Sequence, residues 1–251
     1  MVHLLPLPGS PLFGGSIDAV IGAALIDARA IADGGGNGLV VENFGDRPFF
    51  KRDVPLETIA AMARVIADLS REVKLPYGVN VLRNDARGAL AVAAATGAAF
   101  IRVNVHTGAM VTDQGLIEGD AANTMRLRAA IAPEVAVFAD YMVKHAVPLI
   151  LVDPIQSARD LRVRGLADAL IVTGNATGAA ADPGQIAMLR EAVDAPLIVG
   201  SGLTELNAES FRDADAAIVG TSIKRGGKVD APVDRERVNQ IVRAFKSSGG
   251  R

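Results

Sequence analysis

The sequence contains no cysteine and no tryptophan, and only two of its 251 residues are tyrosine. Without cysteine, a disulfide framework, a thiol nucleophile and thiolate metal ligands are all excluded. With so few large aromatic residues, the core has to be built from alanine, valine, leucine and isoleucine, which suits parallel strands buried on both faces. No apolar run approaches the length of about 18 residues that spans a bilayer, and the first residues lack the basic region of a signal peptide. We therefore expect a cytoplasmic protein without a transmembrane segment.

Charge and motif content exclude two further classes of protein. The net charge is −2, and the lysines and arginines are scattered along the chain rather than gathered in a stripe. The sequence therefore shows no basic patch of the kind that binds nucleic acid. It also lacks the GxxxxGK(S/T) string of a P-loop, which counts against a P-loop mechanism of nucleotide hydrolysis.

One pattern recurs along the chain: a short β-branched run ends in Gly, Asn, Asp or Thr, and an alanine- and leucine-rich helical stretch follows. The eight predicted strands are Val2–Leu5, Gly38–Glu42, Tyr77–Val81, Phe100–Val105, Val135–Asp140, Ala169–Thr173, Leu197–Gly200 and Ala216–Gly220. The predicted helices are Ile17–Ala32, Pro55–Val73, Ala86–Thr96, Ala121–Ala132, Ile155–Val163, Pro183–Val193, Asn207–Arg212 and Asp234–Lys246. Strict alternation predicts a parallel sheet with right-handed crossovers. Eight units in 251 residues favour one closed (β/α)8 TIM barrel over an open doubly wound sheet, with residues 1–251 as a single domain.

Local signals place the boundaries of several elements. The apolar run Leu149–Val152 is interpreted as a loop leading into the short fifth helix, because an Asp-Pro pair follows it at once. Gly97 is expected to close the third helix. Three acidic residues are expected to cap the starts of helices, namely Asp85, Asp120 and Asp182.

The alternation of side chains along each strand predicts which residues face the barrel lumen. Active groups of such barrels gather at the carboxyl ends of the strands. The apolar residues of the predicted fourth strand must meet the helices, so the alternate polar residues point inward: Arg102, Asn104 and His106. The same reasoning places inward His3, Glu42, Asn80 and Asp140, together with Lys144 if the extended backbone continues beyond the fifth strand.

These inward side chains are the candidate catalytic residues: Glu42, Asn80, Arg102, Asn104, His106, Asp140 and Lys144. A carboxylate, Glu42 or Asp140, would serve as the general base, and the two asparagines would orient hydroxyl groups. Arg102, His106 or Lys144 would stabilise developing negative charge. A magnesium ion held by the oxygens of Glu42 and Asp140 is a further hypothesis, although no spacing in the sequence requires a metal.

A purely structural role is the alternative for several of these residues. Arg102 would lie deepest, and a buried charge requires a partner, so an ion pair with Glu42 or Asp140 is expected for it. His3 could be an ordinary core histidine. Lys144 and His145 follow the strand and could lie on the surface.

Small residues end the last three predicted strands. Barrels frequently bind phosphate with the loops after strands seven and eight, because glycine lets the backbone approach an anion and its N–H groups attract one. Ordinary tight turns between strand and helix are the alternative explanation of these glycines. Lys224 or Arg225 could add positive charge. The candidate phosphate-binding residues are Gly174, Asn175, Gly200, Ser201, Gly202, Gly220, Thr221 and Ser222.

The strings VHLLPLPGSP, VVENFGD, GVNVLRNDA, FIRVNVHTGA and ADALIVTGNATG, with the last two glycine loops, resemble the BtpA (BtpA/SgcQ) family over essentially the whole chain. The resemblance implies a TIM barrel of the phosphate-binding type. One branch of the family is named for photosystem I biogenesis, and another is associated with sugar-utilisation gene clusters and labelled a nucleoside triphosphatase. The resemblance implies no residue roles. Its members tend to carry a few residues before the first strand, so the barrel floor is expected to be less covered here or the true start to lie upstream.

Two functions from different classes follow. The first is an enzyme that binds a small phosphorylated ligand, a phospho-sugar or a nucleotide-like metabolite, and transforms it by acid–base chemistry of the isomerase, lyase or phosphate-ester kind. The second is a non-catalytic assembly or stability factor for a membrane complex, which would need an exposed apolar surface. The loops 43–53 and 107–119 exceed a minimal turn. The glycines of the second loop could let it act as a lid, and either loop could form the interface of a homo-oligomer.

Overall fold

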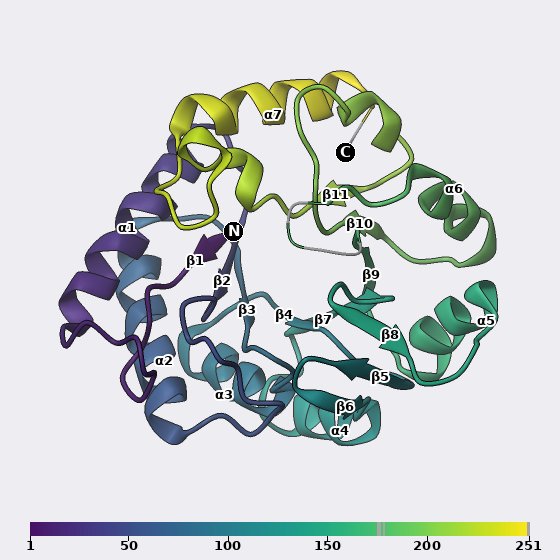
Figure 1. Cartoon of the computed structure of the whole chain (residues 1–251), viewed down its shortest axis with the longest axis horizontal. Coiled ribbons are helices and arrows are strands. Elements are labelled where there is room, and N and C mark those ends of the chain that lie inside the picture. Colours follow the sequence, from purple (N-terminus) through teal and green to yellow (C-terminus); the bar gives the residue numbers. More distant parts are fainter. Residues whose placement is uncertain (175–176, 178, 250–251) are drawn as a thin grey trace.

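The computed structural model describes residues 1–174, 177 and 179–249 and forms a (β/α)8 barrel, as the alternating pattern predicts (Figure 1). Its eight barrel strands pair in parallel in the order in which they follow one another along the chain. They are β1 (Val2–His3), β2 (Leu39–Glu42), β3 (Tyr77–Asn80), β4 (Phe100–Val103), β7 (Ala136–Tyr141), β9 (Ala169–Val172), β10 (Leu197–Val199) and β11 (Ala216–Ala217).

Helices surround this sheet on its outer face (Figure 1). They are α1 (Ile17–Asp33), α2 (Leu56–Glu72), α3 (Ala86–Thr96), α4 (Ala121–Ile131), α5 (Pro154–Arg159), α6 (Pro183–Ala192) and α7 (Arg235–Ser247). The fifth predicted helix ends in a π-helical turn, η1 (Asp160–Arg164). The seventh is a short 3-10 helix, η2 (Ala208–Phe211), rather than an α-helix. In the described part of the chain, no helix is both long and apolar enough to cross a membrane.

The three predicted cap residues each precede the helix that the sequence predicts. The side chains of Asp85 and Asp182 accept hydrogen bonds from the backbone N–H groups of Gly88 and Gly184. Asp120 occupies the cap position of α4 without such a bond, and its carboxylate accepts from the side chain of Asn123 instead.

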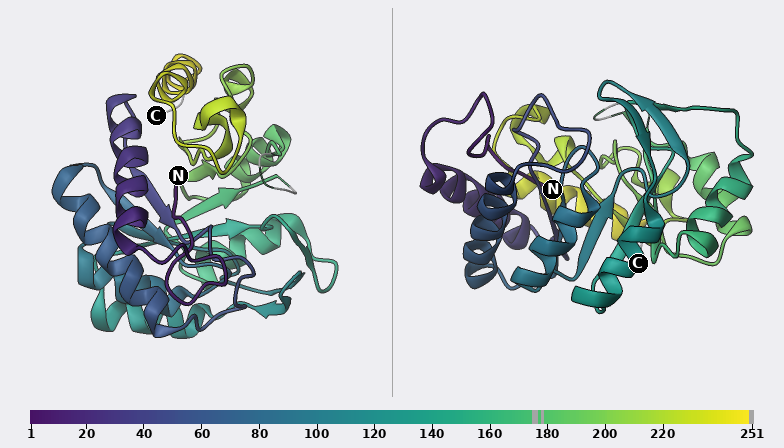
Figure 2. Two further views of the ribbon diagram at one scale, coloured as in Figure 1. Left: turned by 60° about the vertical axis from the view of Figure 1, so that its left-hand side comes forward. Right: turned by 90° about the horizontal axis from the view of Figure 1, so that it is seen from below.

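A second, three-stranded antiparallel sheet lies outside the barrel, and the sequence pattern did not predict it. It joins β5 (Ala109–Thr112) to β6 (Gly115–Glu118) and to β8 (Ala146–Pro148). The first two strands form a hairpin from the long loop after β4, and they stand out from one end of the barrel (Figure 2). Residues 149–152 form the predicted loop before α5.

The core has two layers. The larger lies between the sheet and the surrounding helices and consists of aliphatic side chains. The smaller lines the lower lumen beside a cavity of about 350 Å³, and the rings of Phe100 and Phe138 stack there with their centroids 4.4 Å apart. Arg102 lies two residues beyond Phe100 on the same face of β4, so this apolar floor supports the polar groups above it.

The two ends of the barrel sheet are β1 and β11, and the junction between them is called the seam below. No ladder hydrogen bonds join these two strands within the described chain. The backbone nitrogen of Met1 donates to the carbonyl of Val219 over 2.8 Å. Beside the seam, the ammonium of buried Lys224 pairs with Asp27 of α1 at 2.5 Å. Lys224 therefore neutralises a buried carboxylate, which corrects the expectation that it adds charge to a phosphate site.

Candidate functional site

A small pocket opens where the carboxyl ends of the barrel strands meet. Its walls come from the start of the chain, from β2, β4 and the turn after β7, and from the loops after β9, β10 and β11. The enclosed volume is about 30 Å³, which holds one or two water molecules, so a larger ligand has to extend into the open mouth. The lining residues are Met1, His3, Glu42, Phe44, Arg102, Lys144, Thr177, Gly200, Ser201, Gly202, Gly220, Thr221 and Ser222.

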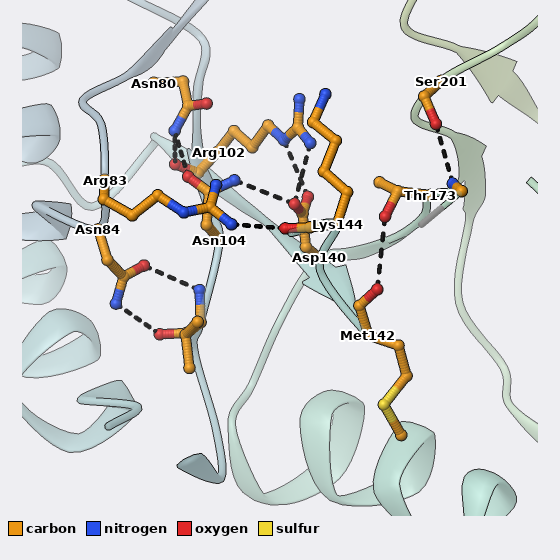
Figure 3. A network of polar contacts seen from close by, with 12 residues as sticks. Asn80, Arg83, Asn84, Arg102, Asn104, Asp140, Met142, Lys144, Thr173 and Ser201 are labelled. Atoms are coloured by element: carbon orange, nitrogen blue, oxygen red, sulfur yellow. Dashed lines mark hydrogen bonds and ion pairs between the residues drawn. The ribbon is translucent and has the colours of Figure 1, made fainter. Parts of the chain in front are cut away.

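A buried ion pair forms the base of this pocket (Figure 3). The Arg102 guanidinium donates two parallel hydrogen bonds to the Asp140 carboxylate, over 2.8 and 2.9 Å, and neither side chain is more than 2% exposed. Burial alone would lower the pKa of Arg102, but the charge of Asp140 and its hydrogen bonds more than reverse this. The ion pair that the sequence predicts for Arg102 is thus made with Asp140. Because both Asp140 oxygens are engaged, the free carboxylate of the pocket is Glu42.

The two lumen asparagines extend the same network. Asn104 donates to Asp140 over 3.0 Å. Asn80 donates to the side-chain oxygen of Asn104 and to the backbone carbonyl of Arg102. Both amides are buried behind the ion pair, where they hold it in place rather than line the pocket.

Lys144 reaches the pocket, although the strand does not continue to it. Strand β7 ends at Tyr141, and the backbone then turns, with positive φ angles at Met142 and His145. The half-buried Lys144 ammonium points toward the Arg102 guanidinium (Figure 3). The guanidinium of Arg83 donates to the Lys144 carbonyl over 2.6 Å. Burial, followed by the charge of Arg102, lowers the pKa of Lys144.

On the opposite wall, the imidazole of His3 faces Glu42, with 3.7 Å between Nε2 and a carboxylate oxygen. Its Nδ1 atom is buried and has no hydrogen-bond partner in the described part of the chain. The ring of Phe44 stacks on the imidazole at 4.5 Å. Burial, and then the positive charges of the N-terminus, Lys224 and Lys144, hold the pKa of His3 well below its usual value. His3 is therefore neutral at pH 7 and can accept a proton only from a strong donor.

His106 is the one proposed catalytic residue that the structure separates from the others. Strand β4 ends at Val103, so the alternation that placed His106 inward does not extend to it. Its buried Nε2 lies 2.8 Å from the carbonyl of Gly165, at the end of the π-helical turn η1. This contact anchors that turn to the barrel and leaves His106 outside the pocket lining.

The glycine-rich loops contribute free donors and close packing. The N–H groups of Gly202, Thr221 and Ser222 have no hydrogen-bond partner among the residues that the structure describes. Gly202 has φ +70°, and a Cβ there would lie 2.2 Å from the backbone of Ala180. A Cβ at Gly220 would come no nearer than 3.3 Å, to the ring of His3. At position 202, a larger residue would therefore clash with the backbone. At position 220, it would instead take up space in the pocket next to His3.

Three of the predicted phosphate-binding residues, Gly174, Gly200 and Ser201, are engaged in hydrogen bonds within the protein. The Ser201 hydroxyl accepts from the N–H of Gly174 and donates to the carbonyl of Ala179, both over 2.9 Å. These bonds brace the chain after β9 against the loop after β10. The N–H of Gly200 belongs to the ladder, where it donates to Val172. Asn175 lies outside the described residues.

The donors around the pocket do not form a metal-binding group. Among residues 1–174, 177 and 179–249, no cluster of three histidine or carboxylate side chains has the geometry to hold a metal ion. The pairing of Asp140 with Arg102 also removes it as a companion ligand for Glu42. The magnesium hypothesis therefore has only one free carboxylate to build on.

Solved structures of similar fold define the class of this protein. A thiamine phosphate pyrophosphorylase from Pyrococcus furiosus matches 90% of this chain and 91% of its own with a TM-score of 0.60 at 14% identity. An N-(5'-phosphoribosyl)anthranilate isomerase from the same organism matches 88% of this chain and 93% of its own with a TM-score of 0.57 at 16% identity. The protein thus has the TIM-barrel fold of these structures.

Sequence comparison then gives the family. The model of the BtpA family matches residues 1–247. The photosystem I biogenesis protein BtpA of Synechocystis is 44% identical over 98% of this chain and 86% of its own length. An uncharacterized protein of Thermococcus kodakarensis is 47% identical over 98% of this chain and 94% of its own length. The chain belongs to the BtpA family, as the sequence motifs indicated.

Sequence reasoning left two contributors out of the candidate list. His3 was placed in the lumen but not among the catalytic candidates, and its unpartnered ring nitrogen became visible only in three dimensions. Arg83 was not among the candidates, and its buried guanidinium braces the turn that carries Lys144. The available signal at Arg83 was a charged residue two positions after a predicted strand, Tyr77–Val81.

Proposed function

We propose that this protein binds a small phosphorylated metabolite at the mouth of the barrel and transforms it by acid–base chemistry. The phosphate would lie against the free N–H groups of Gly202, Thr221 and Ser222, which line the same pocket as Glu42 and Lys144. This coincidence of unused backbone donors with a free carboxylate and a cation is the observation that carries the proposal. Backbone N–H groups at glycine-rich turns are common anion ligands.

The charges around the pocket favour an anion. Arg83, Arg102 and Lys144 supply three positive charges, against the carboxylates of Glu42 and Asp140. Since Asp140 compensates Arg102 directly, the charge of Lys144 is available to a ligand. The names of both structural neighbours, a thiamine phosphate pyrophosphorylase and a phosphoribosylanthranilate isomerase, refer to phosphorylated compounds, which is consistent with this proposal.

In the proposed reaction the phosphate positions the ligand and the groups opposite act on it. Glu42 is the base, because its carboxylate is the one that no buried cation neutralises. The neutral imidazole of His3 would orient the Glu42 carboxylate or pass on its proton. The Lys144 ammonium would stabilise negative charge that develops on the ligand. Arg102, Asp140 and the two asparagines keep these groups in position.

The test is ligand binding by wild-type protein and by Gly220→Ala. Titration calorimetry with inorganic phosphate, and a thermal-shift screen of phosphorylated sugars and nucleotides, should show binding and a raised Tm. The added methyl group of Gly220→Ala meets the His3 ring at 3.3 Å, inside the pocket, and should weaken that binding. Gly22→Ala, at a helical glycine with open space around it, is the matched control and should bind as wild type does.

Absence of any phosphate binding or Tm shift at saturating ligand would overturn the proposal. The assembly role would then gain support, because one observation favours it. The segment from β8 into the following loop exposes the apolar side chains of Val147, Leu149, Ile150 and Leu151. A relative in this family is named for photosystem I biogenesis, and exposed apolar surface of this kind suits contact with another protein.

A further inference from the structure

The half-buried Lys144 differs from Lys224, which is fully buried, in what surrounds its ammonium group. Lys224 is fully buried and pairs with Asp27, which is the usual arrangement of a structural lysine. The Lys144 ammonium forms no ion pair or hydrogen bond with any residue that the structure describes. Only its backbone carbonyl is engaged, by Arg83. Structural pairing therefore does not explain the burial of this side chain.

The surroundings of Lys144 disfavour its charged form. The Arg102 guanidinium lies beside the Lys144 ammonium (Figure 3). The Arg83 guanidinium donates to the backbone carbonyl of Lys144 and so adds a second nearby cation. The carboxylates of Glu42 and Asp140 oppose this effect on the pKa of Lys144 but do not reverse it. Burial and the neighbouring cations therefore lower the pKa of Lys144 and raise the share of neutral amine near pH 7. A neutral lysine is a nucleophile toward carbonyl carbon.

The position of Lys144 also fits a two-point attachment of a ligand. Its side chain lines the same pocket as Gly202, Thr221 and Ser222, whose N–H groups are free. Glu42 lines the same pocket and is available to move a proton. A ligand anchored by its phosphate at the glycine loops would thus present its remaining carbon atoms between an amine and a carboxylate.

We propose that Lys144 forms an imine with the carbonyl carbon of a phosphorylated aldehyde or ketone. This inference rests on the proposed function, and it adds the substrate class. With a carbonyl ligand, the protonated imine nitrogen carries the positive charge that the Lys144 ammonium supplies in the proposed function. The neutral amine attacks the carbonyl carbon, a C–N bond forms, and the carbonyl oxygen takes up the proton that the nitrogen loses, which gives a carbinolamine. The hydroxyl group then leaves as water with a second proton, supplied by solvent, and the protonated imine remains. Addition of water, with return of that proton to solvent, reverses both steps. The protonated imine draws electrons from the adjacent carbon, so that Glu42 can remove a proton there while the electron pair moves toward nitrogen.

Borohydride trapping tests the imine directly. The full chain is incubated with dihydroxyacetone phosphate, treated with sodium borohydride, and analysed by intact mass and peptide mapping. Hydride reduces the imine to a stable secondary amine, so we expect one adduct per chain, located on Lys144. Excess inorganic phosphate should suppress the adduct by competing for the glycine loops. Glycerol 3-phosphate, which has no carbonyl group, should give none.

Two variants separate imine formation at Lys144 from the effect of its positive charge. Lys144→Arg keeps the positive charge but cannot form the imine, so it should lose the adduct while still binding inorganic phosphate in calorimetry. Lys228→Arg changes an exposed lysine in the last glycine-rich loop and should retain the adduct in full. Circular dichroism and Tm measurements show whether both variants are folded.

The outcomes distinguish this inference from the proposed function. If wild-type protein binds phosphate but dihydroxyacetone phosphate and glycolaldehyde phosphate leave no adduct on Lys144, the imine is refuted and the phosphate site stands. If adducts appear only on exposed lysines, or persist in Lys144→Arg, the inference is overturned as well. If no phosphate binds at all, the proposed function fails first, and the inference falls with it.

Discussion

At the scale of single residues, His3 shows how the fold changes the chemistry of a side chain. An exposed histidine takes up a proton near pH 6.5. The buried imidazole of His3 resists protonation because burial and nearby positive charges lower its pKa well below that value. Glu42, at 3.7 Å, does not outweigh them.

This difference predicts a pH dependence of stability. Below pH 6.5 the unfolded chain binds a proton at His3 that the folded chain does not, so the free energy of unfolding falls as the pH is lowered from 6.5 toward the folded pKa. The slope for one such group is at most about 1.4 kcal/mol per pH unit. Urea unfolding at pH 7.0 and 5.5 should show a smaller loss for His3→Asn than for wild type. Equal losses would contradict a depressed pKa of His3.

Charge pairing at this scale also separates structural from reactive groups. Arg102 with Asp140 and Lys224 with Asp27 are buried pairs with good geometry, and each satisfies the requirement that a buried charge has a partner. Neither Glu42 nor Lys144 belongs to such a buried pair of a lysine or arginine with a carboxylate. The proposed chemistry is therefore assigned to these two residues.

At the scale of elements, two glycines in helices show opposite requirements. Gly97 ends α3 with φ +77°, a conformation that favours glycine, while a Cβ there would meet little else. Gly22 lies inside α1, and a Cβ there would meet nothing within 4 Å. The backbone alone therefore decides both substitutions.

We expect Gly97→Ala to lower the free energy of unfolding by about 1 kcal/mol, because alanine is strained in the left-handed region. Gly22→Ala should raise it by about 0.5–1 kcal/mol, because alanine restricts the unfolded chain and favours helix. Urea unfolding of the two variants beside wild type measures both effects. A stabilising Gly97→Ala would show that α3 ends differently from the structure described here.

The small sheet of β5, β6 and β8 is an element that local patterns do not reveal. Its strands come from two loops about 30 residues apart in the chain, and each strand has only three or four residues. Neither loop shows the alternation that marks a half-buried strand. Val111 and Val147 pair on its exposed face. On the other face, Ile117, Met110 and Ala146 pack in a small apolar cluster with two residues outside the sheet, Val105 and Val143, and this cluster forms only when the segments come together.

At the scale of the whole molecule, the seam between β11 and β1 is where the barrel depends on side chains. Since no ladder joins these strands in the described chain, contacts outside the sheet hold the two ends together. Asp27 makes two of them. It pairs with Lys224 and accepts a hydrogen bond from the N–H of Val233 over 2.7 Å, so it ties α1 to the segment that follows β11.

Asp27→Asn should therefore destabilise the protein by about 3–5 kcal/mol, because it leaves the Lys224 ammonium buried without a counter-charge. Glu72→Gln is the control, since it removes the exposed pair between α2 and Arg29 of the same helix α1 and should cost less than about 1 kcal/mol. Thermal and urea unfolding report both changes. Similar small effects of the two substitutions would mean that Asp27 does not hold the seam.

The amino-acid sequence by itself determined the order of the barrel elements and most of the polar groups at the mouth. Hydrophobic periodicity is encoded within a few consecutive residues, so β4 could be recognised, and Arg102 assigned to the lumen, without knowledge of any other segment. The glycine-rich loops were recognised in the same way. The match to the BtpA family over residues 1–247 agrees with that reading.

Only the tertiary structure decided which partner each polar group takes. The choice of Asp140 rather than Glu42 for Arg102, of Asp27 for Lys224, and of the Gly165 carbonyl for His106 depends on segments far apart in the chain. Hydrogen bonds and ion pairs require distances of a few ångströms and defined directions, and these arise only when the whole barrel is assembled. For the same reason, Glu42 and Lys144 are recognised as the available groups only once the ion pairs of Arg102 with Asp140 and of Lys224 with Asp27 are known.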